Sequence, residues 1–126
     1  MTDKAAMIAR AEAYFADVDR FDLEGILSHL TEDIVVEVPT DGVRKEGLAA
    51  VREMYVNRAN MVADSWHGDF IYTADEAERR LAVRLGVKRT NKDGGKVEMD
   101  NLTLLTFDDD RICRVAVWMS GPNSLT

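Results

Sequence analysis

Hydrophobic and polar residues alternate along the last third of the chain in the manner of β-strands. Three strands are predicted there, over residues 81–88, 97–107 and 112–119. Because successive side chains of a strand point to opposite faces, the first of these strands has an apolar face and a basic face. The apolar face consists of alternate residues, which are Leu81, Val83, Leu85 and Val87. The last strand has a similar face, formed by Cys113, Val115, Val117 and Met119.

The middle strand departs from this pattern. Its odd-numbered residues are Met99, Asn101, Thr103, Leu105 and Phe107, so two polar side chains interrupt an apolar face. Polar groups on such a face must find hydrogen-bond partners or serve a ligand. The sequence therefore predicts a pocket against this face of the sheet.

The first half of the chain has mainly the helical period. In chain order it predicts helices over 4–20 and 23–30, a strand over 34–38, a helix over 47–63 and a strand over 66–73. Asp22 is the predicted N-cap of the second helix. Helices near the start and strands near the end indicate an α+β fold, with the helices packed on one face of a largely antiparallel sheet.

Composition narrows the class of protein. A chain of 126 residues predicts one domain spanning 1–126. The net charge of −7 argues against nucleic acid or an anionic membrane as a partner, because phosphate binding requires a basic surface. The single cysteine, Cys113, permits no internal disulfide, and no signal-peptide core or membrane span is evident, so a cytoplasmic location is expected.

Motifs for phosphate binding, metal binding and nucleophilic serine chemistry are absent from the sequence. The chain has only two histidines, His29 and His67, so neither a metal nor another cofactor is expected. His29 is predicted to lie on a helix surface, and Arg58 to belong to a solvated helix face. What remains is general acid–base chemistry in an apolar cavity, which needs only a few carboxyl, imidazole or phenol groups.

Four segments carry a resemblance to a known family. Residues 13–22, 30–39, 46–51 and 104–112 resemble the polyketide-cyclase-like, or SnoaL-like, branch of the nuclear transport factor 2-like superfamily. The resemblance implies a cone, in which a strongly curved antiparallel sheet and three N-terminal helices enclose a deep apolar pocket. It also implies a dimer. Function is less constrained, because this superfamily includes isomerases, dehydratases, cyclases, epoxide hydrolases and non-catalytic modules.

Comparison with ketosteroid isomerases, a more distant resemblance, gives a partial match. Tyr14 aligns with the tyrosine that donates a hydrogen bond to the substrate oxyanion. Val38 replaces the catalytic base, and Thr103 replaces the second oxyanion donor. Steroid isomerisation by the usual route is therefore not expected.

Comparison with scytalone dehydratase gives a second set of residues. Asp19, His67 and Asn101 fall on matching polar positions, whereas the second histidine of that enzyme has no counterpart. Strand alternation complicates the assignment of His67, because Trp66 and Tyr72 belong to the apolar set and His67 does not. A β-bulge near Gly68 would turn His67 inward, as the resemblance favours.

These observations predict a cofactor-independent enzyme for a small apolar, oxygen-bearing substrate such as a polyketide, terpenoid or aromatic carbonyl compound. The reaction expected is dehydration, isomerisation or cyclisation. Asp19 and His67 would form the acid–base pair, and Tyr14 and Asn101 would bind the substrate oxygen. The predicted pocket wall consists of Val38, Tyr55, Trp66, Val83, Leu85, Thr103 and Met119.

Two alternatives remain open. A non-catalytic binding or dimerisation module of the same fold would explain the missing base and the missing histidine. An epoxide hydrolase would need an Asp–Arg–Asp group in the cavity, but alternation turns Arg84 and Asp100 outward. The same alternation places Leu102, Leu104 and Trp118 on the outer face, where a homodimer partner is expected to cover them.

Overall fold

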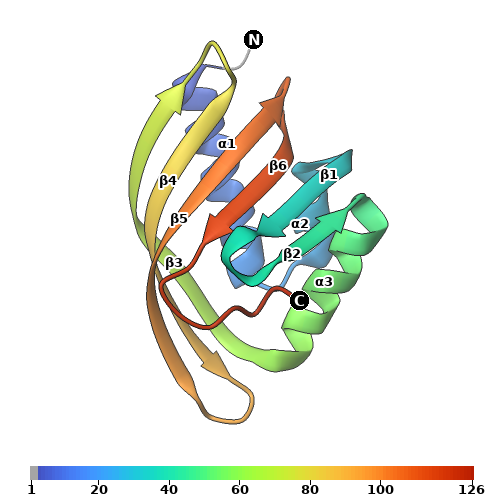
Figure 1. Cartoon of the computed structure of the whole chain (residues 1–126), viewed down its shortest axis with the longest axis vertical. Coiled ribbons are helices and arrows are strands. Elements are labelled where there is room, and N and C mark those ends of the chain that lie inside the picture. The colour runs from blue at the N-terminus through green and yellow to red at the C-terminus, as the bar shows by residue number, and fades with distance from the viewer. Residues whose placement is uncertain (1–2) are drawn as a thin grey trace.

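The computed structural model describes residues 3–126 and has three helices and six strands in that range (Figure 1). In chain order the elements are α1 (Lys4–Asp19), α2 (Leu23–Ser28), β1 (Leu30–Val38), the 3₁₀ turn η1 (Pro39–Asp41), β2 (Val43–Glu46), α3 (Leu48–Met61), β3 (Val62–Asp75), β4 (Arg80–Asn91), β5 (Lys96–Asp108) and β6 (Arg111–Trp118). Asp22 caps α2 as predicted, because its carboxylate accepts a hydrogen bond from the Gly25 N–H at 3.0 Å.

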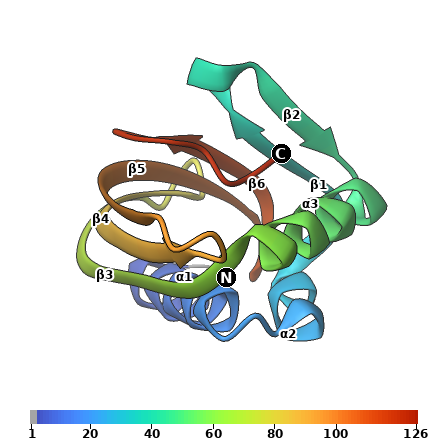
Figure 2. The ribbon, with the colours of Figure 1, turned by 90° about the horizontal axis from the view of Figure 1, so that it is seen from below.

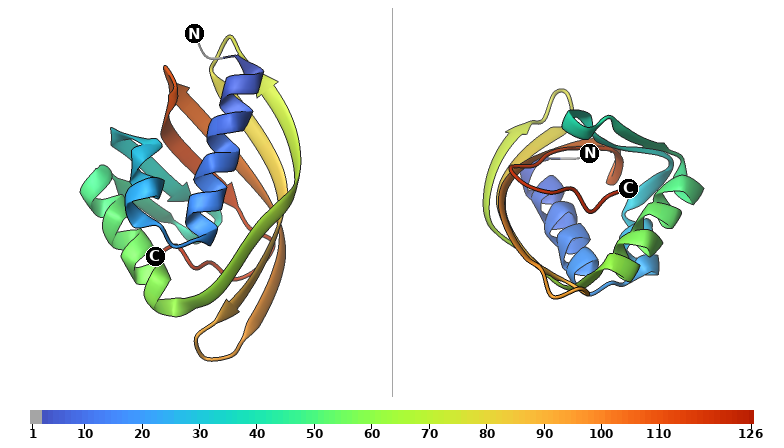
Figure 3. Two further views of the ribbon diagram at one scale, coloured as in Figure 1. Left: turned by 180° about the vertical axis from the view of Figure 1, so that it is seen from behind. Right: turned by 60° about the horizontal axis from the view of Figure 1, so that its bottom comes forward.

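One sheet contains all six strands, in the order β2-β1-β6-β5-β4-β3. Only β1 and β6 run parallel, and the other neighbours are antiparallel. The sheet curls strongly, and α1 lies along its concave side while α3 closes one end (Figures 2 and 3). The predicted α+β fold with a curved sheet is confirmed. None of the described helices has the length and hydrophobicity that a membrane span requires.

The hydrophobic core fills the space between the helices and the concave face of the sheet. Met7 of α1, Val51 of α3 and Leu105 of β5 are fully buried there. In the β4–β5 hairpin, Lys88 lies opposite Glu98 and Leu85 opposite Asn101. This register places the odd-numbered residues of both strands on the concave side.

The strand β2 was not predicted. Three of its four residues are charged, and it forms the outer edge of the sheet, where no hydrophobic periodicity is required. Strand β3 also begins earlier than predicted, at Val62, because α3 ends at Met61 and the chain continues directly into the strand.

A β-bulge interrupts β3 immediately after Gly68. His67 pairs with Val87 and Gly68 with Gly86, but the next pair is Ile71 with Arg84, so two residues of β3 face a single residue of β4. Asp69 lies in this bulge with a φ of 54°. The extra residue exchanges the faces of the strand. His67 therefore points to the concave side, and the hypothesis of a bulge near Gly68 is confirmed.

Trp66 was predicted to line the pocket, and this prediction is wrong. It precedes the bulge, has the opposite parity to His67 and is 39% exposed on the outer face. Its ring covers Gly68 so closely that a Cβ atom there would lie 2.1 Å from it. The Lys88 ammonium lies 5.2 Å from the centre of the ring.

A second bulge, between β5 and β6, changes the position of Cys113. Thr106 pairs with Arg114 and Phe107 with Ile112, so Cys113 is the unpaired residue. Ile112 takes the buried position, and the half-buried Cys113 thiol lies 3.5 Å from the Thr106 carbonyl oxygen. Cys113 therefore does not continue the apolar face of Val115 and Val117, as the alternation had predicted.

Candidate functional site

A hydrogen-bonded pair joins the end of α1 to β3. The imidazole Nδ1 of His67 lies 2.5 Å from Oδ1 of Asp19, and the other carboxylate oxygen accepts the backbone N–H of His67 at 2.9 Å. The Ser65 hydroxyl donates to Oδ1 at 2.8 Å. Ser65 in turn accepts a hydrogen bond from Arg58 of α3 at 2.8 Å. Three donors therefore fix the carboxylate, and the carboxylate fixes the orientation of the ring.

This arrangement assigns the tautomer of His67. A carboxylate can only accept hydrogen bonds, so the proton of the neutral ring belongs on Nδ1. No atom of residues 3–126 forms a hydrogen bond with Nε2. The ring also stacks on Phe15, with the ring centres 5.3 Å apart. In its neutral form, His67 thus presents an unprotonated Nε2 to the pocket, as a general base must.

Two buried tyrosines meet beside this histidine. The hydroxyl groups of Tyr14 on α1 and Tyr55 on α3 are hydrogen-bonded to each other. Burial raises the pKa of Tyr14 well above its usual value, and the neighbouring Tyr55 raises it further. Burial also raises the pKa of Tyr55. Both phenols therefore stay protonated near neutral pH and act as hydrogen-bond donors rather than as acids.

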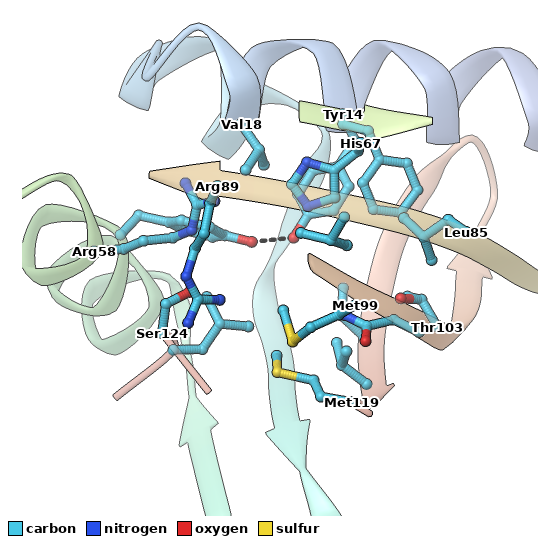
Figure 4. A pocket seen from close by; sticks show the side chains of 17 residues that line it. Tyr14, Val18, Arg58, His67, Leu85, Arg89, Met99, Thr103, Met119 and Ser124 are labelled. Atoms are coloured by element: carbon cyan, nitrogen blue, oxygen red, sulfur yellow. Dashed lines mark hydrogen bonds between the residues drawn. The ribbon is translucent and has the colours of Figure 1, made fainter. Parts of the chain in front are cut away.

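The pocket lies between α1, α3 and the concave face of β4, β5 and β6. Its empty space, together with the open solvent at its mouth, is about 550 Å³. Figure 4 shows His67 and Tyr14 beside each other, with Arg58, Arg89 and Ser124 grouped at one end. The wall consists of Tyr14, Phe15, Val18, Tyr55, Arg58, His67, Leu85, Val87, Arg89, Met99, Asn101, Thr103, Val115, Val117, Met119, Ser124 and Leu125. It is mainly apolar with a few polar groups, as small-molecule sites commonly are.

The segment after β6 forms one side of the pocket. Two residues of the sheet hold it there. The Asn101 side-chain oxygen accepts the Ser120 N–H at 3.2 Å, and Arg89 donates to the Pro122 carbonyl at 2.8 Å. With its oxygen engaged, Asn101 has its NH₂ group available as a donor. Ser124 is 3% exposed at the end of this segment.

The structure brings most of the predicted site residues together. Six of the predicted residues line the pocket beside His67, namely Tyr14, Tyr55, Leu85, Asn101, Thr103 and Met119. Asp19 lies behind His67 and contacts it directly. Val38 and Val83 do not line the pocket, because both are fully buried in the surrounding core.

Two arginines of the pocket were missed. Arg58 was assigned to a solvated helix face, and this is wrong, since it is 4% exposed. It lies three residues after Tyr55 and seven after Val51, so helical spacing already placed it on the inner stripe of α3. Arg89 has the parity of Leu85 on β4 and is 5% exposed. Periodicity was a usable signal for both, but a charged residue is rarely assigned to a buried position.

His29 was predicted on a helix surface and is instead buried, with 7% of its surface exposed. It follows α2, where Nε2 of its ring lies 2.7 Å from the Asp17 carboxylate. Nδ1 lies 3.0 Å from the guanidinium of Arg10. Both ring nitrogens are therefore used inside the protein. Among residues 3–126, no group of three or more His, Cys, Asp or Glu side chains is placed to hold a metal ion.

Comparison with protein families identifies the chain. The family model of the SnoaL-like domain matches residues 11–115, which is most of the sequence. The chain belongs to the SnoaL-like family. This family is part of the nuclear transport factor 2-like superfamily, and the predicted resemblance is confirmed. No curated protein matches the sequence.

Solved structures of other proteins share this fold. SalBIII, described as an epoxide hydrolase/cyclase-like enzyme in pyran ring formation in the polyether salinomycin, superimposes with a TM-score of 0.84 at 22% identity, covering 95% of each chain. A protein provisionally named a polyketide cyclase from Xanthomonas campestris pv. campestris gives 0.82 at 18% identity, covering 93% of this chain and 92% of its own. At these identities the likeness establishes the fold.

Proposed function

We propose that this SnoaL-like protein is a cofactor-independent acid–base enzyme that isomerises, dehydrates or cyclises a small oxygen-bearing substrate. The observation that carries the proposal is the fixed Asp19–His67 pair, whose unbonded Nε2 belongs to a ring that lines an apolar pocket. Solved structures of the same fold include proteins provisionally named as a polyketide cyclase and as an isomerase, which is consistent with this class of reaction.

Each group has a defined task in this proposal. Nε2 of His67 removes a proton from the substrate, and Asp19 stabilises the imidazolium that results. The electrons released move toward the substrate oxygen. The Tyr14–Tyr55 pair and the Asn101 NH₂ donate hydrogen bonds to this oxygen as its negative charge grows. His67 then returns the proton to another carbon, or to a hydroxyl that leaves as water.

The common first step can be measured without the natural substrate. Proton removal beside a carbonyl is followed as deuterium exchange at the α-carbon of a cyclic aromatic ketone such as 2-tetralone, in D₂O by proton NMR. We expect the protein to accelerate exchange, and His67→Gln to lower the enzymatic rate by about 10²- to 10⁴-fold, the usual contribution of a positioned base.

Asp100→Asn provides a matched control for Asp19→Asn. Asp100 lies on the outer face of β5, where it is exposed and paired with Arg84. Asp19→Asn should slow exchange, and Asp100→Asn should leave it unchanged. Equal rates from the wild type, His67→Gln and Asp19→Asn would overturn the proposed chemistry and favour a small-molecule-binding module of the same fold.

We propose further that two copies pair through the outer face of the sheet. Leu102 and Trp118 lie directly opposite each other on β5 and β6, and they are 44% and 39% exposed. Adjacent large apolar side chains on a sheet surface favour a partner. Sedimentation velocity should give a dimer for the wild type and a monomer for Leu102→Lys/Trp118→Lys. A monomeric wild type would contradict this arrangement.

A further inference from the structure

Two buried arginines in the pocket have no direct carboxylate partner among residues 3–126. Arg58 donates to the Ser65 hydroxyl, and its guanidinium carbon lies 5.8 Å from the centre of the Phe21 ring. Arg89 bonds to the Asn91 side-chain oxygen at 3.3 Å and to the Pro122 carbonyl oxygen. All three oxygens are uncharged. Buried guanidinium groups are ordinarily paired with an anion, because removing an unpaired charge from water is costly.

The charges around the pocket do not balance. The nearby carboxylate is that of Asp19. It accepts hydrogen bonds from His67 and Ser65, and its charge also attracts Arg58. Burial lowers the pKa of both arginines, and the charge of Arg58 lowers that of Arg89 further. Two cations therefore face one carboxylate, in a protein whose net charge is −7. Arg52 and Arg84, by contrast, are exposed and each is paired with a carboxylate.

We propose that the substrate of this enzyme carries one carboxylate, which binds between Arg58 and Arg89 while the reacting carbon lies near His67. This inference rests on the proposed function, since it names the class of substrate for the same pocket. A planar guanidinium matches the two oxygens of a carboxylate in geometry as well as in charge. One added negative charge would balance the second arginine.

The surroundings favour a carboxylate on an apolar body over a phosphate ester. Met99 and Met119 line the pocket beside the arginines, and Ser124 lies at the same end as both of them (Figure 4). Arg58 and Arg89 carry two positive charges, and Asp19 balances one of them. A phosphate ester with two negative charges would therefore leave an excess negative charge, whereas a carboxylate would not. The inferred substrate is therefore an aromatic or polyketide-like acid whose carboxylate serves only to bind and takes no part in the reaction.

The test compares two ligands that differ only in charge. Binding of 2-naphthoate and of its neutral analogue 2-naphthamide is measured by isothermal titration calorimetry at neutral pH. The wild type should bind the carboxylate about 10- to 100-fold more tightly, the range expected for a buried charge-assisted hydrogen bond. Arg89→Gln should reduce this preference to within about threefold, and Arg58→Gln should also weaken it.

Arg84→Gln is the matched control, because Arg84 lies on the same strand as Arg89 but faces solvent. It should keep the full preference, and circular dichroism melting should show that all three variants are folded. Equal binding of the two ligands by the wild type would overturn the proposal. So would a preference that Arg89→Gln and Arg58→Gln leave intact, since the arginines would then only hold the chain segments that they contact.

His67→Gln separates this proposal from the acid–base function. It removes the proposed base and leaves both arginines in place, so it should keep the preference for 2-naphthoate. If His67→Gln lost ketone exchange but the wild type bound 2-naphthoate and 2-naphthamide equally, the inference would be rejected and the enzyme function would stand. A clear preference in a protein that catalyses no exchange would reject the enzyme function alone.

Discussion

One helix supplies the aspartates of two histidine–aspartate pairs, and only one of these histidines faces the pocket. Asp19 bonds to Nδ1 of His67 at 2.5 Å, and Asp17 bonds to Nε2 of His29 at 2.7 Å. Residues two apart on an α-helix project about 200° from each other around its axis. α1 can therefore direct Asp19 toward β3 and Asp17 toward the segment after α2.

The two pairs differ in the use of the second ring nitrogen. Nδ1 of His29 is bonded to Arg10, whose guanidinium also contacts Asp110 in the β5–β6 turn. A guanidinium only donates hydrogen bonds, so Nδ1 of His29 must accept and the proton of this ring belongs on Nε2. His29 therefore links α1, α2 and the β5–β6 turn. A His–Asp contact by itself does not indicate catalysis, and the access of the remaining nitrogen distinguishes the two roles.

The largest expected difference is in catalytic rate. His67→Gln should lower ketone exchange by about 10²- to 10⁴-fold, whereas His29→Gln should change the rate by less than about threefold, because only His67 has a nitrogen available to a substrate. Exchange is measured by NMR for both variants at equal concentrations of folded protein. If both variants lost the rate equally, the distinction between the two pairs would be wrong.

Stability should show the opposite order. Asp17 is 7% exposed and bonds to His29 and to Arg20. Asp17→Asn weakens both contacts and should lower the free energy of unfolding by about 1–3 kcal/mol. The Asp19 side chain is 21% exposed, against 9% for that of Asp17, so Asp19→Asn should cost less stability while lowering the rate more. Urea unfolding followed by circular dichroism gives the stability values, and a larger loss from Asp19→Asn would contradict this order.

Alkaline pH provides a further contrast, because Tyr14 lies between the two pairs. Its ring contacts His29 edge-on with centres 6.5 Å apart, and its hydroxyl bonds to Tyr55. The pKa values of both phenols are raised in the folded state. The unfolded chain releases these protons from about pH 10, so the stability that depends on the protonated phenols is complete below that pH and is lost as the pH rises further.

The variant Tyr14→Phe/Tyr55→Phe removes both hydroxyls together and leaves neither unpaired. It should change the free energy of unfolding at neutral pH by less than about 1 kcal/mol. Its stability should also fall less steeply than that of the wild type above about pH 10. Urea midpoints measured on both sides of that pH test this expectation, and parallel curves for the two proteins would refute it.

The smallest effect concerns the positions of two protons. The hydrogen bonds place the ring proton of His67 on Nδ1 and that of His29 on Nε2. Long-range ¹H–¹⁵N spectra at neutral pH should therefore show opposite tautomers for the two rings. The same tautomer in both rings would remove the basis for assigning the base role to His67.

Much of the fold was predictable because hydrophobic periodicity records which side of an element is buried. The inward positions of Asn101 and Thr103 on β5 and the N-cap at Asp22 followed from the sequence alone. The edge strand β2 did not, since a short, charged edge has no burial pattern to detect. A local pattern is informative only where one face of the element meets the core.

The sequence by itself determined the curved α+β architecture, the family, and the presence of polar side chains on the concave face of the sheet. Tertiary structure decided which of them meet. The bulge after Gly68 turned His67 inward, and the fold placed Arg58 and Arg89 in one pocket although they are far apart in the chain. It also engaged both nitrogens of His29 and left one nitrogen of His67 unbonded. Periodicity reports burial one element at a time, whereas the partners of a buried polar group are set by how separate elements pack.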